Sequence, residues 1–578
     1  MRSFAGLPIL MALALTAGQG AVAAPPEDIP PPTREEVQRA APERALMPSH
    51  LTVEPLAPPP CPLAATSGET TTVLGGVVFE GVEEAAATTL KPAYEALVDR
   101  KIAPPDLCGI RDAAAAILAR QGYIAAVEIP PQRLSDGGIA RLRVVMARLV
   151  GFEVRGVAGR RRRLVEAYLR ALVRPAPFNT REAERKLLLA RDLPGLDITF
   201  TLVPAQEPGE VIADVSVKAR PLDVQLGLQN YGSGDTGRWG VLAAAQAANL
   251  IAAGDQLSLG LFSSTHPRRQ IVVQSAYDAR IGHDGLGIGL RFTDAWIRTR
   301  AESGLVFRSH TIVGSLLARY PLVRSQRLDI AASGGLDVID QDLRAQGFLL
   351  TRDRLRTAFL LVDFGIGDTA REQHPPRWRA GGALEVRKGL AALGASRGCG
   401  SAPAFADCAY FPTISRLDAD PQAALVRFSG SAEARVMGAV SIAFTPRAQY
   451  AFAPLLGYEQ FSGGAYTIGR GYDPGAAIGD SGMGLATELR YGALQAWGKQ
   501  LTMQPYAFVD AVRAWIRSAS TPGDDGGTLI SAGGGVRAML GSRVRADLAL
   551  AVPLRTAPSA VRRGDTRVLL SVSTRLSH

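Results

Sequence analysis

The arginine of an Arg-Gly-Tyr triplet and an aspartate further along the chain are the side chains best suited to a specific polar contact. Arg470 lies in the glycine-rich segment IGRGYDPG (Ile468–Gly475), which has no helix-forming surroundings. Asp510 lies in the strand-like segment PYAFVDAV (Pro505–Val512). A guanidinium donates from a planar fork and matches a carboxylate bidentately, so this pair could fasten a loop to a strand. The alternative is that both charges line a wet surface and bind only water.

The two residues after Arg470 have expected structural roles. We expect Gly471 to adopt a backbone angle that a side chain would forbid. We expect Tyr472 to pack its ring against a wall while its hydroxyl is hydrogen-bonded. The alternative for Tyr472 is an ordinary turn aromatic.

The spacing of the remaining reactive residues does not favour catalysis. The six histidines are scattered and have neither triad nor zinc-ligand spacing. The glycines of GLGIGLRF lie in a strand-like segment with no helix after it, so they do not form a nucleotide-binding loop. We therefore predict that the chain is not an enzyme and needs no cofactor or metal.

Composition narrows the class of protein. The 578 residues are 47% hydrophobic and 20% charged, which allows a large core and excludes wholesale disorder. A mean hydropathy of +0.08 is too low for a helical membrane protein but suits a membrane barrel, in which half of each strand faces a polar lumen. The formal charge of +10 could favour anionic lipid or an acidic protein segment. A nucleic-acid partner is not expected for an exported chain.

Export is predicted by the first 23 residues. Arg2 precedes an apolar run from Leu7 to Ala17, and Ala21-Val22-Ala23 is an A-x-A cleavage signature. The run is too short to span a bilayer, and a short buried helix is the alternative. Any membrane crossing by the exported chain must then use strands closed into a barrel.

The four cysteines are expected to pair in an oxidising compartment. Three connectivities are possible, and we favour Cys61–Cys108 and Cys399–Cys408. The first would tie a proline-rich linker to the domain that follows, and the second would close a short loop. A metal site is a weak alternative because the spacing is wrong.

Residues 24–220 divide into a linker and two similar units. Residues 24–72 contain a short helix candidate, with Thr33 and Glu36 at capping-box spacing, and then a proline-rich linker. The units, 73–147 and 148–220, each read as strand, helix, helix, strand, strand. In the first unit the helices are expected near Ala86–Val98 and Pro105–Arg120.

The last strand of each unit is expected to leave an edge that a guest strand could join. The candidate edge segments are GIARLRVVMARL and EVIADVSVKA, and the sequence does not choose between them. The run Arg160–Arg163 at the start of a helix could contact an acidic substrate or lipid headgroups, or it is a solvated helix start.

Residues 221–578 change to a period of two. In DQLSLGLFSS, Leu257, Leu259 and Leu261 lie opposite Ser258 and Gly260. One face suits lipid and the other suits water, and arginines and glutamines recur on the polar face. A soluble sandwich would alternate in the same way. At about 22 residues per strand and connection, the region predicts a transmembrane antiparallel β-barrel of about 16 strands.

Several segments together resemble the two-partner secretion transporters of the ShlB/FhaC/HecB family over essentially the whole mature chain. These are RQGYIAAVEIPPQRLSDGGIARLRVV, ERKLLLARDLPGLDITFTL, LGLQNYGSGDTGRWG, SRLDADPQAALVRFSG and YTIGRGYDPGAAIGDSG. The resemblance implies a mainly β fold with a plug helix, two POTRA domains and a barrel with a long inward loop near 459–485. It also implies that PYAFVDAV is the Phe-x-Asp-x-Gly barrel-strand motif, with Phe508 and Asp510 on the wall. Val512 stands where that motif has glycine, so packing there is expected to differ.

The function implied by the resemblance is secretion of a large exoprotein through the outer membrane of a Gram-negative bacterium. The POTRA domains would lie in the periplasm and bind the unfolded cargo, for example a haemolysin or an adhesin. Outer-membrane lipid and the barrel-assembly machinery would be further partners. The alternatives are an outer-membrane assembly insertase and a passive porin or structural surface barrel.

Overall fold

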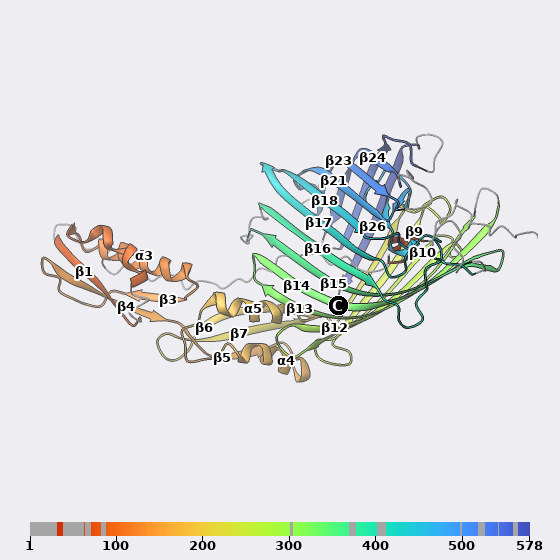
Figure 1. Ribbon diagram of the computed structural model, residues 1–578. Helices are drawn as coiled ribbons and strands as arrows, with labels where there is room; N and C mark the ends of the chain where they lie inside the picture. Colours follow the sequence, from red (N-terminus) through yellow and green to blue (C-terminus); the bar gives the residue numbers. More distant parts are fainter. Residues whose placement is uncertain are drawn as a thin grey trace, which may run out of the picture.

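The computed structural model describes two small α+β domains that form an N-terminal arm, followed by a closed barrel (Figure 1). None of the helices in the described part of the chain is long and apolar enough to cross a membrane. The described residues are 32–38, 63, 71–82, 88–300, 304–368, 377–400, 408, 412–496, 500–517, 526–541, 543–558 and 564–577.

The first domain is a four-stranded sheet in the order β2-β1-β4-β3 with helix α3 packed on it. Of the described residues in the helix expected near Ala86–Val98, only Thr88 and Thr89 are α-helical, and 3-10 turns at Lys91–Ala93 and Glu95–Leu97 follow them. Pro92 explains this, because proline lacks a backbone donor and clashes with a preceding helical turn. The elements are β1 (Thr72–Glu80), β2 (Lys101–Ile102), α3 (Asp106–Arg120), β3 (Ala125–Glu128) and β4 (Gly138–Met146).

The second domain repeats the arrangement with a three-stranded sheet in the order β5-β7-β6. Two helices cover one face of this sheet, and Val165, Leu169 and Leu187 from the helices pack with Val215 of the central strand. The elements are β5 (Arg148–Arg155), α4 (Gly159–Arg170), α5 (Thr180–Arg191), β6 (Leu196–Pro204) and β7 (Glu210–Ala219).

The expected sheet edges are wrong in both domains. β4 lies between β1 and β3, and β7 lies between β5 and β6, so both candidate segments are central strands. In each domain the first strand pairs in parallel with the last one, and the last strand's hairpin partner is left outside. The edge strands are therefore β2 and β3 in the first domain and β5 and β6 in the second.

The barrel is closed by antiparallel pairing of β26 with β8. β21 and β22 both pair with β23 and share one strand position, so the barrel has sixteen strands. The strands are β8 (Leu222–Gln229), β9 (Gly240–Ala248), β10 (Gln256–Ser264), β11 (Gln270–Ile281), β12 (Leu286–Arg300), β13 (Val306–Arg324), β14 (Leu328–Ala345), β15 (Phe348–Gly367), β16 (Trp378–Gly389), β17 (Ala424–Met437), β18 (Val440–Ala451), β21 (Ser481–Tyr491), β22 (Leu494–Ala496), β23 (Leu501–Trp515), β24 (Thr528–Leu540), β25 (Val544–Pro553) and β26 (Arg567–Ser577).

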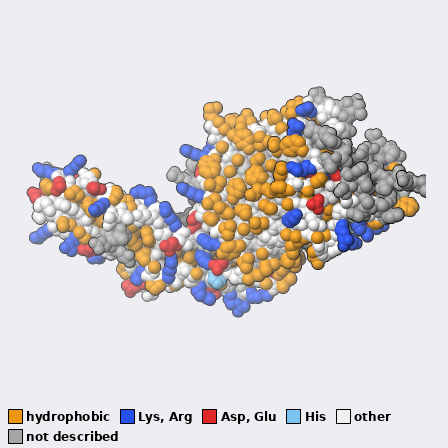
Figure 2. Space-filling view, in the orientation of Figure 1, with side chains coloured by type: hydrophobic (Ala, Val, Ile, Leu, Met, Phe, Trp, Pro, Cys, Tyr) orange, Lys and Arg blue, Asp and Glu red, His pale blue; other side chains and the backbone are white. Residues whose placement is uncertain are grey.

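The barrel wall has an apolar outer face and a polar inner face. On β14, Leu336 and Val338 are exposed, while Asp337 between them and the nearby Ser333 and Gln341 are buried. On the face in view, Figure 2 shows the result as a broad band of hydrophobic side chains across the barrel, with charged side chains gathered toward its ends. This is the surface of a β-barrel that spans a membrane.

The second domain is fastened to the barrel by its helices. Arg324 at the end of β13 holds Asp192, which follows α5, through Nε and Nη2 at 2.7 and 2.8 Å. Lys186 of α5 pairs with Asp284 in the β11–β12 turn. The first domain is joined in turn to the second, because the backbone N–H of Thr180 donates to the carbonyl of Gly122 at 2.8 Å.

Candidate functional site

The loop between β18 and β21, residues 452–480, folds back against the inner wall of the barrel. Its base is a short hairpin in which β19 (Phe461–Gly463) pairs with β20 (Ala477–Gly479). Apolar side chains of the loop pack against β23 and β24, so the loop has a core of its own. That core contains Phe461, Ile468, Tyr472, Ala477, Val512, Ala514 and Leu529.

The structure brings Arg470 of this loop to Asp510 of β23. Arg470 donates three hydrogen bonds to this one carboxylate, from Nη2 at 2.6 Å and from Nε and the backbone N–H at 2.9 Å each. Asp510 is 1% exposed. The guanidinium carbon also lies 3.6 Å from the ring centre of Phe508, within the range of a cation–π contact. Removed from bulk water, a bidentate pair of this kind fixes both position and orientation.

Sequence reasoning missed a second carboxylate at this site. Glu488 of β21 accepts from Nη1 of Arg470 at 2.7 Å and from Arg490 and Arg537 at 2.8 Å each. It is within reach of Arg470 because Glu488 lies directly opposite Phe508 in the β21–β23 register. The period-two pattern gives the face on which Glu488 lies, but only the register shows which residue it meets.

Gly471 is needed for space and not for its backbone angle. Its φ lies outside the left-handed region, whereas Gly464 and Gly469 have φ of 134° and 120°. A Cβ on Gly471 would lie 2.7 Å from Cβ of Ser531 and 3.0 Å from the nitrogen of Pro553. The expectation of a special angle at Gly471 is therefore wrong, and the loop tip instead approaches the wall too closely for any side chain.

Tyr472 is buried and its hydroxyl joins two strand ends. The hydroxyl donates toward the carbonyls of Ile530 and Arg555, at 2.7 and 2.9 Å, and accepts from the N–H of Arg555 at 3.1 Å. Arg567 donates to the carbonyl of Tyr472. The aromatic residue of the triplet thus ties the loop tip to β24 and to the segment after β25.

Val512 occupies the place of a motif glycine, and the loop compensates for its bulk. Val512 is buried against the loop, and a Cβ added at Gly463 would lie 2.8 Å from Cγ1 of Val512. Gly463 of β19 therefore leaves space for the Val512 side chain, which a glycine at position 512 would not need.

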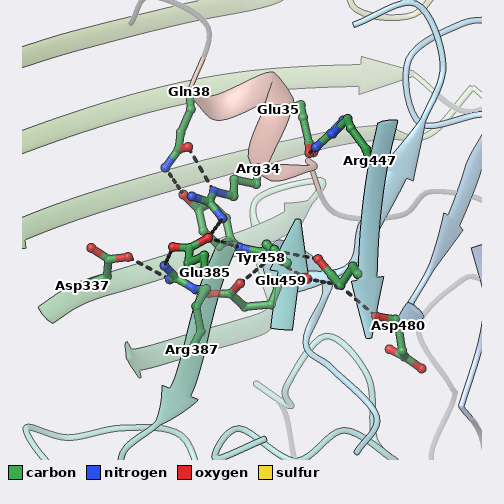
Figure 3. Close-up of polar contacts among 12 residues, drawn as sticks. Arg34, Glu35, Gln38, Asp337, Glu385, Arg387, Arg447, Tyr458, Glu459 and Asp480 are labelled. Carbon is green, nitrogen blue, oxygen red and sulfur yellow. Dashed lines mark hydrogen bonds and ion pairs between the residues drawn. The ribbon is translucent and has the colours of Figure 1, made fainter. Parts of the chain in front are cut away.

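A second charge cluster lies at the base of the same loop (Figure 3). Arg387 of β16 is 2% exposed and donates to Asp337 at 2.7 Å, to Glu385 at 2.8 Å and to Glu459 at 2.8 Å. Arg427 donates to the other oxygen of Glu459 at 2.5 Å. The three carboxylates around Arg387 connect β14 and β16 to residue 459 of the loop, and Arg427 adds β17.

Helix α1 (Arg34–Val37) meets this cluster from inside the barrel. The capping box expected from Thr33 and Glu36 is present, with Glu36 accepting from the N–H of Thr33 at 3.0 Å. Glu35 pairs with Arg447 of β18 at 2.7 Å, Arg34 lies 3.5 Å from Glu385, and Gln38 donates to the hydroxyl of Tyr458 at 3.1 Å. The helix thus contacts strand and loop groups far from it in sequence (Figure 3).

The cysteines divide between the described residues and those outside them. Cys399 and Cys408, in the connection between β16 and β17, form a disulfide. Cys108 of α3 is disulfide-bonded as well, and its expected partner Cys61 lies outside the described residues.

An N-terminal arm of two α+β domains, a sixteen-stranded barrel and an inward loop with an arginine tip define a class of outer-membrane transport barrel. The model of the family "Haemolysin secretion/activation protein ShlB/FhaC/HecB" matches residues 211–538. That match covers more than half of the chain, so the chain belongs to this family of two-partner secretion transporters.

Solved structures share the fold at low sequence identity. CdiB from Escherichia coli is 18% identical with a TM-score of 0.67, covering 94% of this chain and 95% of its own. CdiB from Acinetobacter baumannii is 17% identical with a TM-score of 0.57, covering 88% and 90%. BamA from Haemophilus ducreyi lacking POTRA domains 1–3 is 13% identical with a TM-score of 0.52, covering 86% and 99%. No curated protein sequence matches the chain significantly.

Proposed function

We propose that this chain secretes a large exoprotein across the outer membrane, in an orientation that places its two POTRA domains, 73–147 and 148–220, in the periplasm. The observation that carries the proposal is the family match over the barrel, combined with the Arg470 loop held inside that barrel. Residues 1–23 would be a removed signal peptide, and residues 24–72 would hold the plug helix and its linker.

The free edge of β6 is our proposed docking edge for the unfolded cargo. An extended segment can add to an open strand edge through main-chain hydrogen bonds, which give affinity without a fixed sequence. β6 pairs with β7 in an unbroken register, whereas the β5–β7 pairing is interrupted between Leu149 and Gly151. β6 also begins at Leu196, which lines a cavity of about 880 Å³ against the barrel rim.

A photo-crosslinking residue at the exposed Thr201 of β6 tests this edge. The matched control is Ser216, which is also exposed but lies on the central strand β7. We expect cargo crosslinks at Thr201 and few at Ser216. Equal crosslinking at both positions would rule out strand addition at this edge.

The Arg470–Asp510 pair is proposed to act as a latch that positions the inward loop for transport. Its support is the burial of Asp510 and the three hydrogen bonds from one residue. Helix α1 is proposed to occupy the lumen at rest, supported by its contacts with β18 and with Tyr458.

An assembly insertase and a passive porin are the other candidate functions. The BamA structure supports only a shared fold at 13% identity, and two N-terminal domains are fewer than the array expected of an insertase. A passive porin would not explain the second domain that is fastened to the barrel turns.

The proposal is tested by deleting the gene and comparing the proteins of the culture medium and cell surface by mass spectrometry. We expect one large exoprotein to disappear, and to return when the chain is supplied again. Unchanged secreted proteins, or a general loss of outer-membrane barrels, would contradict secretion; the general loss would favour an insertase.

A further inference from the structure

The turn between β9 and β10 holds two large apolar side chains away from the protein. Leu250 is 52% exposed and Ile251 is 71% exposed. The turn lies beside the second N-terminal domain, since the side-chain amide of Asn249 donates to the carbonyl of Pro194 at 2.8 Å. A pair of exposed apolar residues next to a domain surface indicates a contact with something apolar.

The turn is rigid, so this exposure is built into the fold. Asp255 is fully buried and accepts hydrogen bonds from the N–H groups of Leu250, Ile251 and Ala252 at 2.8, 2.9 and 2.7 Å. The hydroxyl of Tyr277 donates to the same carboxylate at 2.9 Å. With every oxygen of Asp255 engaged, the turn cannot fold its apolar tip inward without breaking several of these bonds.

Helix α4 places a basic surface next to this tip. Arg160 donates to the carbonyl of Ile251 at 2.8 Å, and a Cβ on Gly254 would lie 3.1 Å from a methyl of Leu164. Arg163 is a neighbour of Arg160 on the helix surface, because residues three apart lie one turn from each other. Arg163 is therefore on the side of α4 that meets the turn.

Two arginines of this helix are available for a ligand. Arg162 is engaged with Glu166 at 2.8 Å, but Arg161 and Arg163 make no ion pair with any residue that the structure describes. Arg161 lines a pocket of about 360 Å³ together with Ala253 of the same turn. The positive charge and the apolar tip thus form one continuous surface.

The bilayer surface must pass close to this point. β10, which begins directly after the turn, carries the exposed apolar residues Leu259 and Leu261 on the outer wall. Tyr277 beside the turn combines a ring with a bonded hydroxyl, as aromatic residues at membrane interfaces do. Figure 2 shows blue side chains gathered at the lower edge, where the second domain meets the apolar band.

We propose that Leu250, Ile251, Arg161 and Arg163 form a docking surface for anionic phospholipid in the leaflet on the side of the N-terminal domains. The apolar tip would enter the acyl region while the guanidinium groups bind headgroup phosphates, the division of labour found in interfacial membrane contacts. The lipid would then fix the second domain against the membrane. This inference needs only the transmembrane barrel and is independent of secretion.

Native mass spectrometry of the full chain in detergent, titrated with phosphatidylglycerol or phosphatidylcholine, measures this binding. The R161Q/R163Q variant is expected to bind phosphatidylglycerol about 30-fold more weakly, since each basic residue near an anionic surface contributes about fivefold. The matched control, R133Q/R143Q, removes the same charge from exposed positions of the first domain and should leave binding unchanged. Heat-dependent gel mobility confirms that each barrel is folded.

A second variant keeps the charges and removes the apolar tip. Ile251→Ser should weaken binding of both lipids by about tenfold, because Ile251 is the more exposed of the two tip side chains and would no longer transfer apolar area into the lipid. Wild-type affinity for phosphatidylglycerol in R161Q/R163Q, or equal loss in R133Q/R143Q, would overturn the proposal. Binding of an acidic peptide such as polyglutamate in place of the lipid would overturn it in favour of a protein partner.

Discussion

Replacing Asp510 with alanine is the sharpest perturbation of the inward loop. The substitution removes the acceptor of three hydrogen bonds from Arg470 and leaves this guanidinium with Glu488 and the ring of Phe508. Breaking a buried ion pair by removing one partner costs about 3–5 kcal/mol. Because Glu488 remains and the Arg470 side chain is 18% exposed, we expect the lower end, about 3 kcal/mol.

Hydrogen exchange of two loop amides reports this cost directly. The N–H groups of Arg470 and Gly471 donate to Asp510 and to Ser531 in the latched state. A loss of about 3 kcal/mol corresponds to exchange about 150-fold faster at these positions. The measurement is exchange in detergent followed by mass spectrometry of peptides that cover residues 461–479.

The control and a mutant cycle separate a local latch from general damage to the wall. Asp363→Ala removes a similar carboxylate, paired with Arg319 on a part of the wall away from the loop, and should leave loop exchange unchanged. Arg470→Ala combined with Asp510→Ala should cost less than the sum of the two single variants. Loop exchange in Asp510→Ala at the wild-type rate, or equal acceleration in Asp363→Ala, would show that Asp510 does not hold the loop.

Three further outcomes follow from the same contacts. Gly471→Ala should destabilise the latched loop by about 1–3 kcal/mol through contact with Ser531, whereas Gly365→Ala, with open space around its Cβ, should be neutral in loop exchange. Reduction of the Cys399–Cys408 disulfide should destabilise the connection between β16 and β17 by about 2.5 kcal/mol through lost loop-closure entropy. The expected sign is faster hydrogen exchange around Thr413, whose carbonyl accepts from the backbone N–H of Arg352, and unchanged exchange there would contradict this expectation. Lys186 lowers the pKa of Asp284 through its hydrogen bond and its charge. The ion pair between α5 and the β11–β12 turn therefore contributes its full stability above the ordinary aspartate pKa, and this stability is lost as the pH falls through the lowered pKa of Asp284. Acid-dependent exchange of α5 should therefore shrink in Asp284→Asn, and an unaltered pH profile would contradict this origin.

The sequence predicted the parts of the fold that depend on one strand or one motif. Alternation along residues 221–578 predicts the two-faced wall, because side-chain direction in a strand has a period of two. The meeting of Arg470 with Asp510 was anticipated because the family resemblance supplied the long-range pairing.

Contacts that depend on the register between strands could not be predicted from the period-two pattern. Glu488 is a lumen partner of Arg470 only because it lies opposite Phe508, and Arg387 collects carboxylates from β14, β16 and the loop. The sheet edges of the N-terminal domains were mistaken because chain order does not give spatial order. In each domain the first strand pairs in parallel with the last, so the strand that forms a hairpin with the last one lies at the edge of the sheet.

Secretion by the Arg470→Ala variant shows whether transport depends on the latched loop. The measurement compares exoprotein in the culture medium with the amount of folded barrel in the membrane, for this variant and for the wild type. We expect secretion to collapse while the barrel remains inserted and heat-modifiable, because the loop tip loses the guanidinium that binds Asp510 and Glu488. Normal secretion from an equally abundant Arg470→Ala barrel would contradict it.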